Sequence, residues 1–183
     1  MRSRALSLAS AFSALCSTPG YAQVYLNRDQ ALDLACRREE IKEYDPQVVT
    51  SEIAKLLDKK NLGEEEKDIA HFFKCRNGEV ITGYALIDGE IGKHMPITYI
   101  VAINTEGKIS RVEMMVFRET IGSEARERAF MSQFEGKDLT DNLSIGSGIR
   151  NVTGATLSAR AIAKGVKRAL FLWEQFYGGN NLR

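Results

Sequence analysis

The 183-residue sequence lacks several features that would mark a special class of protein. It has only three prolines and no low-complexity run, which argues against a disordered chain. Its formal net charge is +1, and no basic stripe with interleaved aromatic residues occurs. We therefore expect no nucleic-acid partner. After the N-terminal segment no long apolar run occurs, so the mature protein is expected to be soluble.

The first 22 residues have the pattern of an export signal. Arg2 and Arg4 precede an apolar run over residues 5–16, and a Gly-Tyr-Ala sequence ending at Ala22 fits a signal-peptidase site. The run is shorter than the ~20 residues that a membrane span needs. We expect residues 1–22 to be a signal peptide and the protein to be periplasmic or otherwise exported. An N-terminal core helix is the alternative.

Cysteine is scarce, and only Cys36 and Cys75 would remain after export. In an oxidising compartment two such residues often pair. A bridge between them would close a loop of about 40 residues, worth roughly 4 kcal/mol in the chain-entropy model. Two buried thiols are the alternative, because the sequence does not show how closely the Cα atoms approach. Neither cysteine belongs to a Cys-x-x-Cys motif, which argues against thioredoxin-like chemistry.

The chain divides into a helical lead-in and a β-rich part. Residues 23–67 are expected to be helical, with Asn27 as the N-cap of one helix and a second helix from Ser51. After residue 67, an Asn-Gly turn and β-branched or aromatic runs predict antiparallel hairpins. The predicted strands cover residues 69–74, 80–87, 96–103 and 109–117.

Two further helices are predicted beyond the sheet. Ser123 is expected to cap a helix that continues through Phe134 and ends at Gly136. Apolar residues at helical spacing predict a last helix from about residue 156 to 176, followed by a tail over 178–183. The predicted fold class is α+β, an antiparallel sheet packed by helices, with a functional domain over residues 68–177.

Hydroxyl side chains cluster where the last predicted helix begins, at Thr153, Thr156 and Ser158. The N–H groups of a helix start lack intrahelical partners, and with the macrodipole they favour an anion. Gly154 has no Cβ, so a ligand can approach the backbone closely. This pattern indicates a phosphate site. The alternative is that Thr153 is an ordinary N-cap beside small packing residues.

The stretch from Thr153 to Ser158 resembles the [Ser/Thr]-Gly-Ala-Thr-x-[Ser/Thr] signature of the FMN-binding domain family. That family includes the C subunit of the Na⁺-pumping NADH:quinone reductase and the G subunit of the Rnf electron-transport complex. The resemblance extends from about Gly78 to Leu170. Shorter motifs recur in the family's order: Gly83-Tyr84-Ala85, Gly92-Lys93, Pro96-Ile97-Thr98-Tyr99, Arg118-Glu119-Thr120-x-Gly122 and Gln133-Phe134-Glu135-Gly136-Lys137.

The resemblance implies that FMN is linked through its phosphate to the hydroxyl of Thr156. A separate exported flavin transferase would make this attachment, using FAD and a divalent metal. The turn Glu119-Thr120-Ile121-Gly122 would border the isoalloxazine. The residues expected to bind the cofactor are Lys93, Glu119, Thr120, Gly122, Thr153, Gly154, Ala155, Thr156, Leu157 and Ser158.

One position departs from the family's pattern. An acidic residue usually precedes the modified threonine by six positions, and this chain has Arg150 there, followed by Asn151. An arginine beside the anchor is suited to pair with phosphate directly. This departure favours non-covalent FMN as the alternative, while the resemblance to the Gly-Ala-Thr signature keeps covalent FMN as the first expectation.

Other candidate residues carry weaker signals. Lys93 would place a positive charge near the reduced flavin, or it is a solvated loop lysine. His71 and His94 have no ligand partners at metal-binding spacing, so no metal site is predicted. Trp173, Tyr84 and Tyr99 are expected in the core.

These patterns together predict an exported FMN flavoprotein that transfers electrons between redox protein partners. A carrier is favoured over a substrate-transforming enzyme, because the cofactor would supply the chemistry, and no catalytic residue is predicted. Two rivals remain open, a non-redox exported module that binds a ligand or protein, and a flavoenzyme acting on a small substrate.

Overall fold

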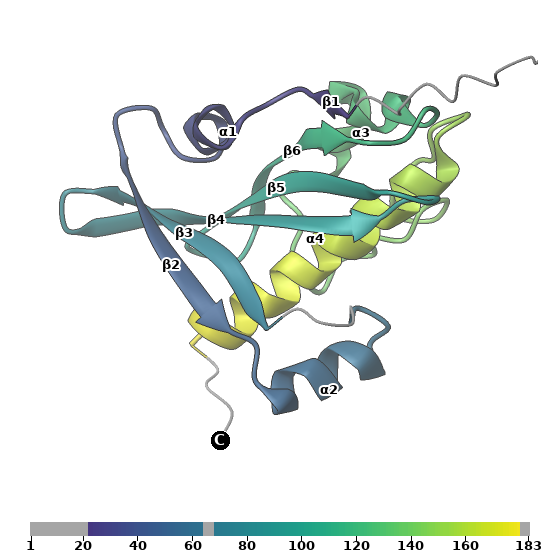
Figure 1. Cartoon of the computed structure of the whole chain (residues 1–183). Coiled ribbons are helices and arrows are strands. Elements are labelled where there is room, and N and C mark those ends of the chain that lie inside the picture. Colours follow the sequence, from purple (N-terminus) through teal and green to yellow (C-terminus); the bar gives the residue numbers. More distant parts are fainter. Residues whose placement is uncertain (1–21, 64–67, 180–183) are drawn as a thin grey trace, which may run out of the picture.

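A six-stranded antiparallel sheet forms the centre of the computed structural model, which describes residues 22–63 and 68–179 (Figure 1). The strand order is β1-β6-β5-β4-β3-β2, so strands that follow one another from β2 to β6 are neighbours. The strands are β1 Gln23–Val24, β2 Ile41–Val48, β3 Ile69–Asn77, β4 Val80–Ile91, β5 Pro96–Asn104 and β6 Ile109–Phe117.

Helices cover both faces of this sheet. The long helix α4 (Thr156–Tyr177) crosses one face, and the short helix α1 (Arg28–Ala35) lies on the other (Figure 1). Helix α2 (Ser51–Lys59) lies between β2 and β3 in the chain. Between β6 and α4 are the 3₁₀ turn η1 (Ser123–Arg126), the one-turn helix α3 (Arg128–Met131) and the 3₁₀ turn η2 (Ser132–Phe134).

The main core lies between α4 and the sheet. Phe72, Val101 and Ile162 are fully buried there, and Tyr99 is buried beside Gly165 of α4. A Cβ at Gly165 would overlap the Tyr99 hydroxyl oxygen, so a glycine is needed for α4 to approach the sheet this closely. A second, smaller core lies under α1.

The predicted strands after residue 67 are confirmed, and β4 extends four residues further than expected, to Ile91. The hairpin turn between β3 and β4 has Gly78 at φ +59°, as an Asn-Gly turn requires. The last helix begins at Thr156 as predicted and ends at Tyr177. The core positions of Tyr99 and Trp173 are also confirmed.

The helical N-terminal region expected over residues 23–67 is only partly helical. Helices α1 and α2 form, and the side chain of Asn27 caps α1 in a capping box. However, β1 and β2 belong to the sheet. Strand β2 was not among the predicted strands, because residues 23–67 were expected to be helical. In the described sheet it is an edge strand that pairs with β3, where Pro46 is tolerated.

The prediction of a single helix from Ser123 to Phe134 is also wrong. Glu127 has an extended backbone, with ψ +137°, and it divides the segment into η1, α3 and η2. Ser123 does not act as a cap, because the N-cap of η1 is Gly122. The expected signal peptide over residues 1–22 lies outside the described residues except for Ala22, and the tail lies outside them from residue 180 on.

A disulfide joins Cys36, at the end of α1, to Cys75 in β3, with the Cα atoms 5.4 Å apart. This pairing resolves the two alternatives that the sequence left open. The bond holds the end of α1 against the sheet. Within residues 22–63 and 68–179, no helix combines the length and apolar character needed to cross a bilayer.

Candidate functional site

A cleft of about 600 Å³ opens where the start of α4 meets two loops at one end of the sheet. One loop joins β4 to β5, and the other follows β6. Nine of the ten residues predicted to bind the cofactor line this cleft, namely Lys93, Glu119, Thr120, Gly122, Gly154, Ala155, Thr156, Leu157 and Ser158. The fold therefore brings together three motifs that lie far apart in the sequence.

Ile121, which was expected in the turn bordering the isoalloxazine, also lines the cleft, whereas His94, Met95 and Arg118 were not predicted to do so. Each lies within two residues of a predicted site residue, so extending the Gly92-Lys93 and Glu119-Thr120 motifs by two residues would have found them. Thr153, the tenth predicted residue, is exposed and is not part of the cleft lining.

At the start of α4, no side chain caps the backbone N–H groups. Its N-cap is Ala155, and no side-chain hydrogen bond caps the helix, so Thr153 as an ordinary N-cap is wrong. Gly154 has φ +82°, and a Cβ built on it would meet nothing within 4 Å. The first turn of a 22-residue helix thus faces the cleft without a capping oxygen, an arrangement that favours an anion.

Thr156, the expected anchor, is the first residue of α4 and is half-buried. Its Oγ1 accepts a hydrogen bond of 2.9 Å from Nδ2 of Asn151. Two residues later, Ser158 is only 3% exposed and lies against Gly122 in the turn after β6. Thr156 therefore lines the cleft, while Ser158 joins the helix start to the opposite wall.

Glu119 acts as a brace between the two loops. Its Oε1 accepts the backbone N–H groups of His94 at 2.7 Å and Met95 at 3.1 Å. Partial burial tends to raise the pKa of the Glu119 carboxyl, but the hydrogen bonds from His94, Met95 and Lys93 outweigh it, and the pKa lies below its usual value. The ionised Glu119 carboxylate therefore holds the loop after β6 against the loop between β4 and β5.

Arg118 makes a similar connection from the neighbouring position. Its Nη1 donates to the carbonyl oxygen of Pro96 at 3.1 Å and to Oγ1 of Thr98 at 3.0 Å. Lys93 is exposed, and it lines the same cleft. With Arg118 and Lys93 against the single carboxylate of Glu119, the charges of the cleft favour an anionic ligand.

Arg150, the departure from the family's pattern, does not line the cleft. Its backbone N–H donates to Oε1 of Gln133 at 2.8 Å, and its Nε lies 3.4 Å from the same oxygen. The structure therefore directs Arg150 toward Gln133, and this arrangement does not support the direct pairing of Arg150 with phosphate.

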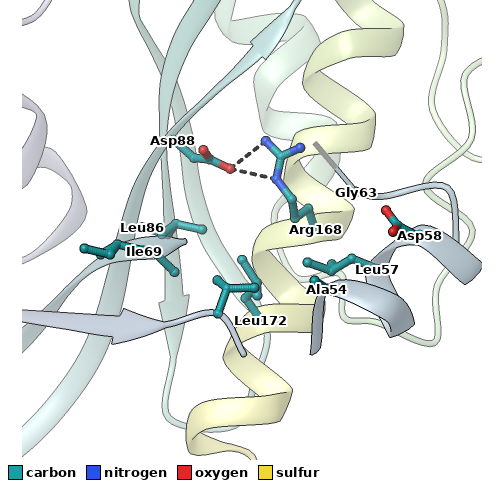
Figure 2. A pocket seen from close by; sticks show the side chains of 11 residues that line it. Ala54, Leu57, Asp58, Gly63, Ile69, Leu86, Asp88, Arg168 and Leu172 are labelled. Atoms are coloured by element: carbon teal, nitrogen blue, oxygen red, sulfur yellow. Dashed lines mark hydrogen bonds and ion pairs between the residues drawn. The ribbon is translucent and has the colours of Figure 1, made fainter. Parts of the chain in front are cut away.

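A smaller cavity of about 130 Å³ lies between α2, β3, β4 and α4 (Figure 2). Figure 2 shows Arg168 of α4 directed at Asp88, among apolar side chains such as Leu86 and Leu172. Arg168 is twelve residues beyond Thr156, roughly 18 Å along the helix, and the two cavities share no lining residue. This cavity is thus separate from the cleft.

The histidines do not come together. His94 lines the cleft, whereas Nδ1 of His71 lies 2.8 Å from the Tyr44 hydroxyl. Among the described residues, one group of three possible metal ligands occurs, Cys36, Glu40 and Cys75, and its two sulfurs are joined in the disulfide.

The fold is α+β, and its cleft lies at a helix start that has no side-chain cap, an arrangement that favours an anion. Residues 92–171 match the FMN-binding domain family. The chain is 29% identical over 126 residues to the G subunit of the ion-translocating oxidoreductase complex of Stutzerimonas stutzeri, covering 63% of this chain and 55% of that protein. It is 28% identical over 129 residues to the G subunit of the proton-translocating ferredoxin:NAD(+) oxidoreductase complex of Clostridium ljungdahlii, covering 67% and 68%.

The fold is similar to that of NqrC from Shewanella oneidensis, with a TM-score of 0.51 and 18% identity, over 66% of this chain and 65% of that one. The chain thus spans little more than half of the Stutzerimonas relative. The match to the FMN-binding domain family extends over residues 92–171, and the chain is similar in sequence to the G subunits of these two complexes. The family match supports FMN as the cofactor.

Proposed function

We propose that the cleft holds FMN with its phosphate at the start of α4, joined to Oγ1 of Thr156 as a phosphoester. The observation that carries this proposal is that the helix start, without a side-chain cap, places Thr156 on the same cleft as the other motifs of the family. The chain would then be an exported electron-transfer module.

The residues present fit the cofactor. A phosphate needs N–H donors and close approach to the backbone, and Gly154 with its open surroundings provides that approach. A flavin needs a cleft of several hundred Å³, and about 600 Å³ is within the usual range for ligand sites. Exposed apolar side chains at the edge, Ile121 and Leu157, suit the contact of a flat ring with protein.

The proposed attachment transfers the FMN group of FAD to the Thr156 hydroxyl. The Oγ1 atom of Thr156 forms a bond to the phosphorus next to riboflavin, the pyrophosphate bond breaks, and AMP leaves with the electron pair. The hydroxyl proton passes to a base of the exported flavin transferase that we propose as the loading partner. This chain contributes the nucleophilic oxygen and holds it at the helix start.

When bound, FMN supplies one- and two-electron chemistry. The protein holds the cofactor in place and keeps it from diffusing away. Glu119 and Arg118 fix the loops that would border the isoalloxazine, and Lys93 would place a positive charge beside it. The donor and acceptor would be redox proteins that dock at the cleft through a small transient interface.

Export and the periplasmic location are part of the proposal. The Cys36–Cys75 disulfide suits an oxidising compartment, and residues 1–22 have the signal pattern. The rival from another class is a non-redox module that binds a phosphorylated ligand, because the same helix start suits any phosphate. Non-covalent FMN binding is the second alternative.

The test is an intact-mass measurement on the mature protein after incubation with a flavin transferase, FAD and Mg²⁺. The wild type should gain the mass of one FMN less one water and stay yellow after denaturation. Thr156→Ala should gain no mass, whereas Thr120→Ala, which removes another hydroxyl of the same cleft, should still be loaded. A wild type that stays colourless and unmodified would falsify the flavoprotein proposal.

A further inference from the structure

We propose that Asn151 is the positioning residue for the anchor threonine, an inference that rests on the proposed flavin attachment. Its side-chain amide donates to Oγ1 of Thr156 across 2.9 Å. Asn151 lies immediately after Arg150, the position where the family's acidic residue is missing.

The local backbone explains how these two side chains meet. The carbonyl oxygen of Val152 accepts the N–H of Ala155 at 3.1 Å, which closes a turn. Gly154 adopts φ +82° within this turn, a value that favours glycine. The turn reverses the chain, so that residue 151 lies beside residue 156. Asn151 thus reaches the first residue of α4 from the segment that leads into the helix.

The segment before Asn151 is also held. The amide side chain of Gln133 accepts the N–H of Arg150 at 2.8 Å, and its Nε2 lies 3.4 Å from the carbonyl oxygen of Arg150. The preceding residue, Ile149, is buried in the core. Asn151 therefore extends from an anchored backbone, and its amide can restrict the rotamer of Thr156.

The direction of the hydrogen bond defines what Asn151 does. An amide N–H can only donate, so it occupies one lone pair of Oγ1 and leaves the hydroxyl proton and the second lone pair available. Asn151 therefore does not remove the proton during attachment. Its role is to hold Oγ1 toward the cleft so that the oxygen meets the phosphorus of FAD in one orientation, which a freely rotating threonine would not ensure.

The experiment compares loading rates of the mature, disulfide-bonded protein with a flavin transferase, FAD and Mg²⁺, followed by intact mass. Asn151→Ala should lower the rate at saturating protein substrate by about tenfold or more, with little change in the concentration giving half-maximal rate. Asn151→Asp keeps the side-chain shape, and its carboxylate can accept a hydrogen bond from the Thr156 hydroxyl. This variant should therefore load within about threefold of the wild type.

The chain offers a matched control in the same loop. Asn142 Nδ2 donates to Oγ of Ser147 at 3.1 Å, also five residues apart and exposed. Ser147→Ala removes that hydrogen bond and should load at the wild-type rate. Thermal unfolding of Asn151→Ala should match the wild type, because Asn151 is exposed.

Two results would overturn the inference, and they are distinguishable. If the wild type is loaded and Asn151→Ala is loaded at the same rate, Asn151 has no positioning role although the flavin attachment holds. If neither wild type nor variant gains mass, the proposed attachment fails, and the role of Asn151 fails with it.

Discussion

Gly122 lies so close to Ser158 that a Cβ added to Gly122 would overlap the Ser158 hydroxyl oxygen. The contact joins the turn after β6 to the first turn of α4, within the lining of the cleft. Gly122 also has φ +101°, a left-handed conformation that favours glycine. The shape of the cleft therefore depends on the absence of one methyl group.

Gly122→Ala should destabilise the protein by more than about 2 kcal/mol, since it adds backbone strain to a steric clash. Gly136 provides the matched control, because it has φ +76° but nothing within 4 Å of its position for a Cβ. Gly136→Ala should cost about 1 kcal/mol from strain alone. Urea denaturation of both variants measures the two losses. Equal losses would show that the contact with Ser158 has no energetic weight.

Arg168→Ala should be among the most damaging single substitutions in α4. Its guanidinium is 3% exposed and pairs with Asp88 and Glu90, each at 2.6 Å. Removing this buried cation takes an ion pair from both carboxylates, although Lys164 still contacts Glu90, and the loss of such a partner costs about 3–5 kcal/mol.

Lys164→Ala serves as the comparison for Arg168, because Lys164 also pairs with Glu90, at 2.8 Å, but is 35% exposed. Its loss should cost about 1 kcal/mol or less. Thermal and chemical unfolding should rank the two variants in this order. A larger loss for Lys164 would contradict the assignment of Arg168 as the central group of the network.

Asp45 should make the stability depend on acid pH. Its burial tends to raise the pKa, but hydrogen bonds from Lys74 at 2.8 Å and Tyr177 at 2.7 Å outweigh this, and the pKa lies below its ordinary 3.8. A depressed folded-state pKa contributes stability above the unfolded pKa, and that contribution is lost as the pH falls through the folded value.

The free energy of unfolding of the wild type should therefore exceed that of Asp45→Asn by a constant amount between about pH 5 and 7. The difference should shrink as the pH falls below about 4, and Tyr177→Phe should show the same trend with a smaller amplitude. Denaturation curves over this pH range provide the measurement. A difference that grows toward acid pH would contradict the sign.

Much of the architecture could be predicted from local patterns. The Asn-Gly turn before β4 and the alternation in β6 are local signals, and Asn27 is a local cap, so each was correct. Strand β2 was not predicted, and it tolerates Pro46 because it lies at the sheet edge, which is a tertiary property. The three short turns after Gly122 were missed because the extended backbone of Glu127 has no sequence signal of its own.

The candidate site was also predicted in part from local motifs and decided in part by the tertiary structure. Sequence motifs named ten of its lining residues, Ile121 among them. The other three, His94, Met95 and Arg118, came with loops that Glu119 and Arg118 hold together through backbone contacts. Thr153 shares the motif with Thr156 yet lies outside the cleft lining, because Gly154 reverses the chain between them.

By itself, the sequence determined the helix that begins at Thr156, the hairpins of the sheet and the resemblance to the FMN-binding domain family, because these depend on neighbouring residues and local motifs. Only the tertiary structure decided that Cys36 pairs with Cys75, that Arg150 turns toward Gln133 and that Asn151 bonds to Thr156. Those outcomes depend on how the packing of distant elements sets Cα separations and side-chain directions, and no local pattern encodes that packing.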